Sequence, residues 1–492
     1  MSIVVKAASS LALLTCLAFP AHGADESLTP VIDMLEMLDA GTLDIQVIQD
    51  WHTVDGPVAT RQKIINISVG HVWADQDYRI PVRMVVPLTG KATGFHLTGG
   101  HGLRDFQRDM RVNGVDRILL EGGVGLVHTM VQTLAQSDQK QLGKEMDDKF
   151  IETLNPRYSI QYWGWPATLM RSITAAYAET EHFAKGRIAM SGGSKNGATP
   201  SAVLIQDPRT TAVHASVSPI WDSPLRMCDE EAWAGLRAFN QRYVDGITKD
   251  TGKGGPERLL RHPFLGGTFG PIYNRRALAA GHSWEDLQKT AELVADHVFV
   301  TRNLKQLKTR NVDMFFHPGT HDFVCFDVAW GGRHHPKMPV YLECNAGHGQ
   351  KPHPTAEKGQ ANKSAFLISH FFADAPDMPA TPTISYQHTG DRITVTVSFP
   401  PDEPSESGRI WWIYNRGIDG SAAYLREHFP DEQWSDMQWD EARKVWTAEI
   451  ELKKGVSHID FFSNHRRTLT YKSAKYPTYV SSPYTRIQLT RS

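Results

Sequence analysis

The chain has 492 residues, of which 52 are basic and 54 acidic, and its formal charge is −2. A single domain usually has about 100–200 residues, so this length predicts two or more domains. The near balance of charge gives no bulk electrostatic reason to expect nucleic acid or an anionic membrane as a partner. We therefore expect a globular protein whose partner is neither of these.

The beginning of the chain has the pattern of a secretory signal peptide. Lys6 precedes the apolar run 11–19, and Ala21 and Gly23 place small residues at the two specificity positions of a signal-peptidase site. The run is shorter than the about 20 residues of a membrane span, and no later segment is long enough. We predict a signal peptide at residues 1–23, export to the periplasm or the medium of a bacterium, and no stable membrane insertion. A lipoprotein anchor at Cys16 is the alternative.

Residues 24–374 are expected to form an α/β domain. Two alternating segments, 60–70 and 78–87, predict half-buried strands, the second with one face made of Ile80, Val82, Met84 and Val86. Strands then alternate with a helix: the strands are expected at 94–100, 123–131, 186–190 and 210–221, and the helix at 166–184. This order favours a parallel sheet covered on both faces.

About ninety residues separate the strand at 210–221 from the next one at 312–318, whereas a crossover helix needs only about a dozen. The segments 230–244, 256–264 and 283–299 have helical periodicity and many aromatic residues. We therefore expect a helical cap insertion at about 222–305, over the carboxyl edge of the sheet. A strand at 338–345 and a helix at 363–372 would complete the domain.

A short polar stretch at 375–383 contains three prolines and is expected to be a linker. Beyond it the helical period disappears. Strand patterns recur at short intervals, the first with Ile393, Val395, Val397 and Phe399 alternating with polar residues. We predict an all-β sandwich domain at 384–492.

The segment GRIAMSGGSKNGATP (186–200) has the layout of a nucleophile elbow, a strand-to-helix turn that exposes a serine hydroxyl. The pattern G-x-S-x-G is not met at either Ser191 or Ser194. If Ser191 were the nucleophile, the helix would have to begin through Gly192 and Gly193, at about 1 kcal/mol for each glycine. We therefore predict Ser194, with the two glycines at positions that need positive φ and close packing.

The rest of the elbow carries three expectations. Asn196 stands where the second glycine of the pattern would be, and asparagine tolerates cramped backbone conformations. Gly197 would let the helix approach the sheet. Pro200 would kink the helix, because it lacks the N–H that bonds the carbonyl four residues earlier.

A serine nucleophile needs a histidine base and a carboxylate that orients it. In α/β-hydrolases these follow the serine in the order acid, histidine, on loops after later strands. Asp322 follows the strand at 312–318, and His348 follows the strand at 338–345, so we predict the triad Ser194, Asp322 and His348. Asp222 is the reserve acid, and Asp327 is a further rival.

An acyl-transfer site also needs hydrogen-bond donors for the developing oxyanion. The expected donors are the N–H of Lys195, directly after the nucleophile, and the glycine-rich loop around Gly100 and His101. Aromatic residues at 162, 163 and 165 lie near the same edge, where buried packing is favoured over a pocket-lining role: Tyr162, Trp163 and Trp165.

The mature chain retains three cysteines, at most two of which can be joined within the chain. A bridge between Cys325 and Cys344 would brace the acid loop against the histidine loop, and we state it as a hypothesis. A metal cluster is the alternative reading of His334, His335, His348 and His353, but they lack a ligand spacing and an acidic pair. We predict no metal and no cofactor.

Several of these motifs together resemble one known family. They are HVWADQDYRIPVRMVVP, MSGGSKNGAT, SPIWDSP, HPGTHDFVCFD, ECNAGHG and a tryptophan-rich tail, spread over most of residues 45–490. The chain resembles the PhoPQ-activated pathogenicity-related proteins, exported bacterial proteins with an α/β-hydrolase domain and a small C-terminal β-domain. The resemblance implies Ser194, Asp322 and His348 as the triad, and it implies no substrate.

The elbow itself is similar to two known forms. The family's elbow is typically G-A-S-K-R-G, from which G-G-S-K-N-G differs at two of six positions while keeping the Ser-Lys pair. It also resembles the G-C-S-R-N-G elbow of glucuronoyl esterases, which likewise lacks the second glycine.

We therefore expect an exported serine hydrolase that cleaves a small-molecule or saccharide carboxylic ester through an acyl-enzyme. One alternative is a carbohydrate esterase that acts on acylated or glucuronoyl sugars. The other is a non-catalytic envelope or binding protein on a hydrolase scaffold.

Overall fold

The computed structural model describes residues 31–73, 76–216, 219, 221–244, 274–322, 325–347, 351–401, 403, 405–417 and 427–489. The predicted signal peptide at 1–23 and the helix expected at 256–264 lie outside these residues. Within them, no helix combines the length and the apolar composition that crossing a membrane requires.

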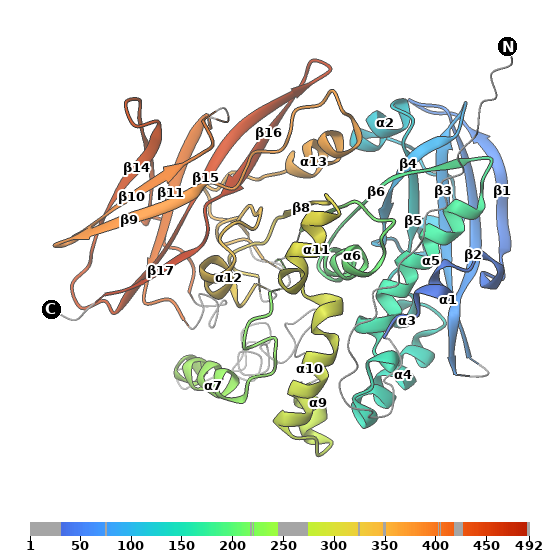
Figure 1. The fold of residues 1–492 in the computed structure, drawn as a ribbon, viewed down its shortest axis with the longest axis horizontal. Helices are drawn as coiled ribbons and strands as arrows, with labels where there is room; N and C mark the ends of the chain where they lie inside the picture. The colour runs from blue at the N-terminus through green and yellow to red at the C-terminus, as the bar shows by residue number, and fades with distance from the viewer. Residues whose placement is uncertain are drawn as a thin grey trace, which may run out of the picture.

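The larger part of the protein is built around an eight-stranded mixed sheet (Figure 1). Its strands are β1 (Gln46–Val54), β2 (Thr60–Trp73), β3 (Gln76–Pro87), β4 (Ala92–Thr98), β5 (Gly125–Thr129), β6 (Phe183–Gly193), β7 (Ala212–Ser216) and β8 (Asp313–Phe316). They are ordered β1-β2-β3-β5-β4-β6-β7-β8. Strands β1, β2, β3 and β5 pair antiparallel, and β5, β4, β6, β7 and β8 pair parallel.

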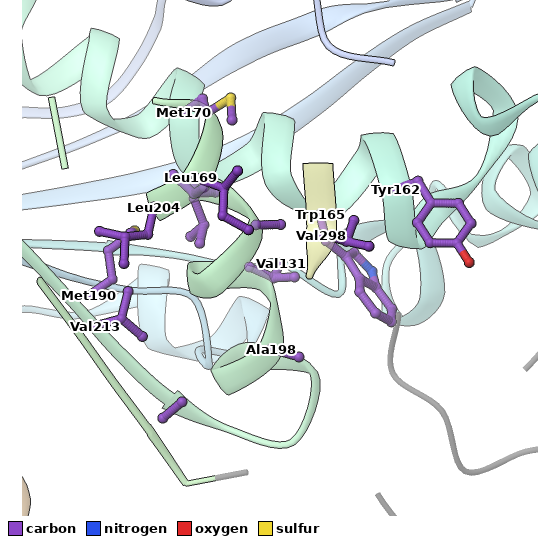
Figure 2. Packing of buried hydrophobic residues seen from close by; sticks show 14 of the residues in the cluster. Val131, Tyr162, Trp165, Leu169, Met170, Met190, Ala198, Leu204, Val213 and Val298 are labelled. Carbon is purple, nitrogen blue, oxygen red and sulfur yellow. The ribbon is translucent and has the colours of Figure 1, made fainter. Parts of the chain in front are cut away.

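Helices cover both faces of this sheet, as the alternation of elements predicts. Helices α5 (Trp165–Ala178) and α6 (Lys195–Gln206) pack on one face, and α2 (Gly114–Glu121) and α13 (Asn362–Phe371) on the other. Figure 2 shows the first core, where Leu169 and Met170 of α5 lie near Leu204 of α6 and Met190 of β6. The protein is therefore a mixed α/β protein with a large, partly parallel sheet.

The side chains of β3 alternate between the two faces of the sheet, as the sequence pattern predicts. Ile80, Val82, Met84 and Val86 are fully buried in the core on the side of α5, so this prediction is confirmed. Val85 points to the opposite face and joins the second core. Alternation with period 2 places successive side chains on opposite faces of a strand.

The long segment between β7 and β8 is helical where the structure describes it. It contains α7 (Glu230–Val244), α9 (Asn274–Ala279), α10 (Trp284–Val298), a 3₁₀ turn η6 (Val300–Asn303) and α11 (Leu304–Thr309). Helix α10 begins at a capping box in which Ser283 and Asp286 satisfy each other's backbone N–H. It packs against α6, the helix that follows the predicted nucleophile.

The strand expected at 338–345 forms only two isolated parallel bridges, Phe316 to Val340 and Gly319 to Glu343. Hydrogen bonds link Tyr341 N–H to the Phe316 carbonyl and Glu343 N–H to the Pro318 carbonyl. A regular parallel ladder would also have a hydrogen bond from the N–H of residue 318, between these two bonds, but residue 318 is a proline and has no N–H. The prediction of a continuous strand is therefore wrong, although the segment lies where that strand would lie.

Two antiparallel sheets follow at the C-terminal end (Figure 1). The strands are β9 (Thr383–Thr389), β10 (Arg392–Ser398), β11 (Ser407–Tyr414), β12 (Trp434–Asp436), β13 (Gln438–Asp440), β14 (Val445–Glu451), β15 (His458–Tyr471), β16 (Ala474–Ser481) and β17 (Thr485–Gln488). One sheet is ordered β13-β14-β10-β9, the other β12-β11-β15-β16, with β17 also on β15. Ile393, Val395 and Val397 are fully buried between them, as their alternation predicts.

The remaining helical elements are mostly short. They are α1 (Met34–Leu38), η1 (Ala40–Thr42), η2 (Leu103–Gln107), α3 (Thr133–Gln136), α4 (Lys140–Thr153), η3 (Pro156–Tyr158), the π-helical turn η4 (Ile160–Gly164) and α12 (Val328–His334). Among them, α12 packs against β17 of the C-terminal sheets.

Candidate active site

Ser194 is the single residue between strand β6 and helix α6. It follows the last residue of β6 and precedes Lys195, the first residue of α6. Its backbone has φ 54° and ψ −128°, a conformation that costs a non-glycine residue about 1–3 kcal/mol. Such strained strand-to-helix turns are where α/β-hydrolases expose a nucleophilic serine.

The residue that takes the strain differs from our expectation. The positive φ belongs to Ser194 itself, and not to Gly192, Gly193 or Asn196. Asn196 lies within the first turn of α6, where its backbone is helical. It needs no left-handed conformation, so the absence of a glycine at this position imposes no backbone cost.

Gly192 is required for close approach. A Cβ at position 192 would lie within 3.0 Å of the carbonyl oxygen, carbonyl carbon and Cβ of Asn196. In α6 the Asn196 carbonyl would accept a hydrogen bond from residue 200, but Pro200 has no N–H. The turn therefore brings β6 against a carbonyl that the helix leaves without its usual donor.

Ser191, the other serine of the elbow, belongs to the core. Its side chain is buried, and its Oγ lies 2.8 Å from Nε2 of His96 on β4. A hydroxyl in this position is turned into the sheet, away from any substrate. The contact favours Ser194 over Ser191 on grounds independent of the backbone.

The predicted oxyanion donors come close to the elbow. Lys195 is the first residue of α6, so its N–H is one of those that a helix leaves without an intrahelical acceptor. Gly100 follows β4, and a Cβ there would lie 3.4 Å from Nδ2 of Asn196. The structure thus places the Gly100 loop directly against the first turn of α6.

The His101 ring packs against Thr98 and His128. Its Nε2 lies 2.7 Å from Thr98 Oγ1, and the ring stacks on His128 with centroids 4.2 Å apart. Burial lowers the pKa of His101 to about 4, so the ring is neutral at pH 7. A neutral His101 adds no positive charge to the loop, which leaves its backbone as the part suited to an oxyanion.

The Lys195 side chain is held in place beside the elbow. Its Nζ donates to Oε1 of Gln132 at 3.0 Å and lies 5.9 Å from the centroid of the Trp165 ring. Gln136 donates to the same Gln132 oxygen at 2.7 Å. Burial lowers the pKa of Lys195 below its ordinary value.

The loop that carries Asp322 is joined to the segment that leads to position 348. The His321 N–H donates to the Ala346 carbonyl at 2.9 Å, and Asn345 N–H donates to Thr320 Oγ1 at 2.9 Å. A Cβ at Gly319 would overlap the Ala346 carbonyl, so only glycine allows this approach. Asp322 is 7% exposed.

His348 lies outside the described residues. The structure describes the preceding segment up to residue 347 and brings it beside the Asp322 loop.

Residues between β11 and β12 contact both loops. Arg416, which is fully buried, donates from one guanidinium nitrogen to the Thr320 carbonyl at 2.5 Å and from the other to Tyr484 Oη at 3.1 Å. Asn345 exchanges two hydrogen bonds of 2.8 Å with the backbone of Phe429. Sequence reasoning missed Arg416 and Asn345, because neither belongs to a motif and their partners are 84 to 96 residues away in the chain.

The two rival acids are engaged elsewhere. Asp222 lies 2.7 Å from Thr301 Oγ1, 3.0 Å from Arg302 Nε and 3.6 Å from His335 Nε2. Burial alone would raise the pKa of Asp222, but the hydrogen bonds from His335 and Thr301 lower it to about 2. Both of its oxygens are therefore occupied.

Asp327 is completely buried in an ion pair. Arg226 lies 2.7 Å from its Oδ2, and Ser223 Oγ donates to the same oxygen at 2.7 Å. This carboxylate neutralises the buried guanidinium of Arg226 and is engaged in that ion pair.

The hypothetical bridge between Cys325 and Cys344 is not formed. Both side chains are buried thiols, and burial raises the pKa of each. Hydrogen bonds between backbones, rather than a disulfide, join the two loops that the cysteines flank.

The described histidines of the considered metal cluster have separate partners. His334 Nδ1 lies 2.9 Å from the Trp330 carbonyl, His335 contacts Asp222, and His353 Nε2 lies 3.3 Å from Asp431.

The aromatic group before α5 belongs to the hydrophobic core. Tyr162, Trp163 and Trp165 are between 0% and 6% exposed, so the expectation of buried packing is confirmed. Figure 2 shows Tyr162 and Trp165 on the side of this core away from Leu204 and Met190.

No family model and no curated protein matches the chain. Among solved structures, acetyl xylan esterase 1 from Thermoanaerobacterium sp. matches at 14% identity over 57% of this chain and 74% of that one, with a TM-score of 0.32. A glucuronoyl esterase from Teredinibacter turnerae matches at 12% identity, 58% and 64% coverage and a TM-score of 0.33. Candida antarctica lipase A in its closed state matches at 11% identity, 68% and 83% coverage and a TM-score of 0.30. These proteins are esterases and a lipase, but at such TM-scores the likeness adds nothing to the argument from the site.

Proposed function

We propose that the protein is an exported serine hydrolase of the α/β-hydrolase fold that cleaves carboxylic esters. The observation that carries this proposal is the backbone conformation of Ser194, with φ 54° and ψ −128°, at the one-residue turn between β6 and α6. The strand order supports it, because the turn follows a central parallel strand and the acid loop follows β8. The resemblance to the PhoPQ-activated pathogenicity-related proteins leads to the same fold and the same export.

In the proposed reaction, Ser194 Oγ attacks the ester carbonyl while His348 takes its proton, and Asp322 orients His348 and stabilises the imidazolium. The N–H of Lys195 and the backbone around Gly100 and His101 donate to the oxyanion. His348 then gives its proton to the leaving alcohol, which leaves an acyl-enzyme on Ser194. Water, deprotonated by His348, hydrolyses the acyl-enzyme and releases the acid.

Ester hydrolysis by two single variants tests this proposal. With p-nitrophenyl acetate and longer acyl esters, Ser194→Ala should lower kcat by at least about 10⁴-fold. Ser191→Ala is the matched control: it should retain kcat within about 3-fold and lose about 1–2 kcal/mol of stability, because it removes the partner of His96.

A different result would reject the proposal. If the Ser194→Ala and Ser191→Ala proteins both retain wild-type rates, Ser194 is not the nucleophile. If the wild-type protein hydrolyses no ester, the non-catalytic scaffold is the better description.

A carbohydrate esterase is the second candidate. The elbow favours it through its resemblance to the G-C-S-R-N-G form of glucuronoyl esterases. Higher kcat/KM on acetylated or glucuronoyl sugars than on simple acyl esters would favour this candidate over a general esterase.

A further inference from the structure

A groove of about 830 Å³ crosses one edge of the C-terminal sheets, far in sequence from the elbow. It lies between the β13–β14 hairpin and the segment that follows β10. Its walls include Phe399, Pro400, Ser405, Trp439, Arg443 and Trp446. We call it the sandwich groove. Its volume lies within the range of about 300–1,000 Å³ that is usual for sites that bind small molecules.

Two tryptophans form the aromatic wall of the sandwich groove. Trp439 and Trp446 are direct partners across the β13–β14 pair, with ring centroids 5.3 Å apart and planes inclined by 55°. The Trp439 indole N–H donates to Glu441 at 2.6 Å, and the Trp446 indole N–H donates to Ser405 at 2.6 Å. With both N–H groups already bonded, the indoles offer a ligand their carbon faces and no donor.

Trp439 is 37% exposed, whereas Trp446 is 9% exposed. Trp439 is also the single large apolar residue among the described lining residues with more than a third of its surface exposed. A protein-binding surface usually presents several clustered apolar residues. One exposed aromatic face in a groove better suits a ligand that presents a single small apolar face at this point.

The charges of the sandwich groove cancel locally. Glu406 lies 3.0 Å from Arg466, and its oxygens also accept from the N–H and Oγ1 of Thr468. Lys444 contacts Glu441, and Arg443 lies 3.6 Å from Asp440. Because each charge has an opposite neighbour, the groove does not select for a charged ligand. Side chains such as Arg443, which is 59% exposed, retain donors for hydroxyl groups.

We propose that the sandwich groove binds an uncharged polysaccharide chain. A sugar ring has one face of C–H groups and a rim of hydroxyls, which matches an indole face beside neutralised polar groups. The ring would stack on Trp439, and its hydroxyls would bond to Arg443 and to the free lone pairs of the groove carboxylates. This proposal concerns a site outside the elbow and does not depend on the proposed hydrolase reaction.

Affinity electrophoresis of the full-length protein tests it. Native gels would contain hydroxyethyl cellulose, glucomannan or arabinoxylan as neutral polymers, and polygalacturonate as a charged one. We expect at least one neutral polymer to retard the wild-type protein. Trp439→Ala should weaken this binding at least 10-fold, and Trp439→Tyr, which keeps an aromatic face, should retain most of it.

Tyr386→Ala is the matched control. Tyr386 is an exposed aromatic residue of β9, at the opposite edge of the same sheet. This variant should bind as the wild type does, and Ser194→Ala should too, which separates this proposal from the hydrolase. Retardation by polygalacturonate alone, by no polymer, or to the same extent in Trp439→Ala and wild type would overturn the proposal, and so would equal loss in Tyr386→Ala.

Discussion

The two halves of the proposed active site are built differently. The serine half is contiguous: β6, Ser194 and α6 follow one another, and their geometry depends on residues within about ten positions. The acid half consists of two loops separated by about twenty residues, and hydrogen bonds join the loops to each other. Each loop is also bonded to the C-terminal part of the chain, Thr320 to Arg416 and Asn345 to Phe429. The comparison shows that the serine turn is a local structure, whereas the acid half depends on hydrogen bonds with residues from the C-terminal part of the chain.

The largest effect expected in the acid half comes from removing its carboxylate. Asp322→Asn should lower kcat for ester hydrolysis by about 10³–10⁴-fold, because the histidine then loses the partner that fixes its tautomer. Steady-state kinetics at pH 7 measure this.

Asp222→Asn is the control for that variant, and it should keep kcat within about 3-fold. It should lose stability above pH 4 only. A carboxyl whose pKa is lowered to about 2 stabilises the fold above its unfolded pKa, and this contribution disappears as the pH falls from about 4 to 2. A large loss of kcat in Asp222→Asn with none in Asp322→Asn would reverse the assignment.

The second effect tests whether the C-terminal sheets position the acid loop. Arg416→Gln removes the hydrogen bond to the Thr320 carbonyl, so we expect kcat to fall about 10- to 100-fold with little change in KM. Arg392→Gln, which breaks an exposed pair with Glu449, is the control. It should leave kcat unchanged and change the free energy of unfolding by no more than about 0.5 kcal/mol.

A purely structural role for Arg416 would give a different pattern. If Arg416 acts through the acid loop, adding Arg416→Gln to Asp322→Asn should cause little further loss of kcat. Equal fold-losses in the wild-type and Asp322→Asn backgrounds would mean that it acts elsewhere.

The third effect concerns acid stability on the serine side. His101 is neutral in the folded protein with a pKa of about 4, against 6.5 when unfolded. Its contribution to stability is present above pH 6.5 and decreases as the pH falls to 4, by up to about 3 kcal/mol. Urea unfolding across this range should show a shallower loss for His101→Gln than for the wild type.

The exposed His388 supplies the comparison for that measurement. His388→Gln is the surface substitution measured beside His101→Gln. An identical pH dependence in His101→Gln and wild type would show that His101 titrates normally.

The smallest effect concerns the missing glycine of the elbow. Asn196→Gly restores the G-x-S-x-G pattern at a position that is already helical, so we expect kcat within about 3-fold of wild type and a loss of no more than about 1 kcal/mol in stability. Thermal melting and ester kinetics measure the two quantities. A tenfold or larger gain in kcat would mean that Asn196 does constrain the elbow.

The sequence predicted the features that depend on short-range pattern. Alternation gave β3 and β10 with their buried faces, and the strand-to-helix turn at Ser194 was located to the residue. The strain at Ser194 was assigned to the neighbouring glycines instead, because composition does not say which residue of a turn takes positive φ. The interrupted ladder at Val340 followed from Pro318 on the partner strand, a pairing that neither segment reveals alone. The role of Arg416 depends on a contact across 96 residues, which no local pattern encodes.

Mapping the attachment site of a fluorophosphonate probe tests the central claim most directly. The probe forms a covalent bond with an activated serine, and peptide mass spectrometry identifies that serine. We predict a single adduct on Ser194 in the wild-type protein and in Ser191→Ala, and none in Ser194→Ala or Asp322→Asn within the same reaction time. An adduct on any other residue, or undiminished labelling of Ser194→Ala, would contradict the claim that Ser194 is the nucleophile.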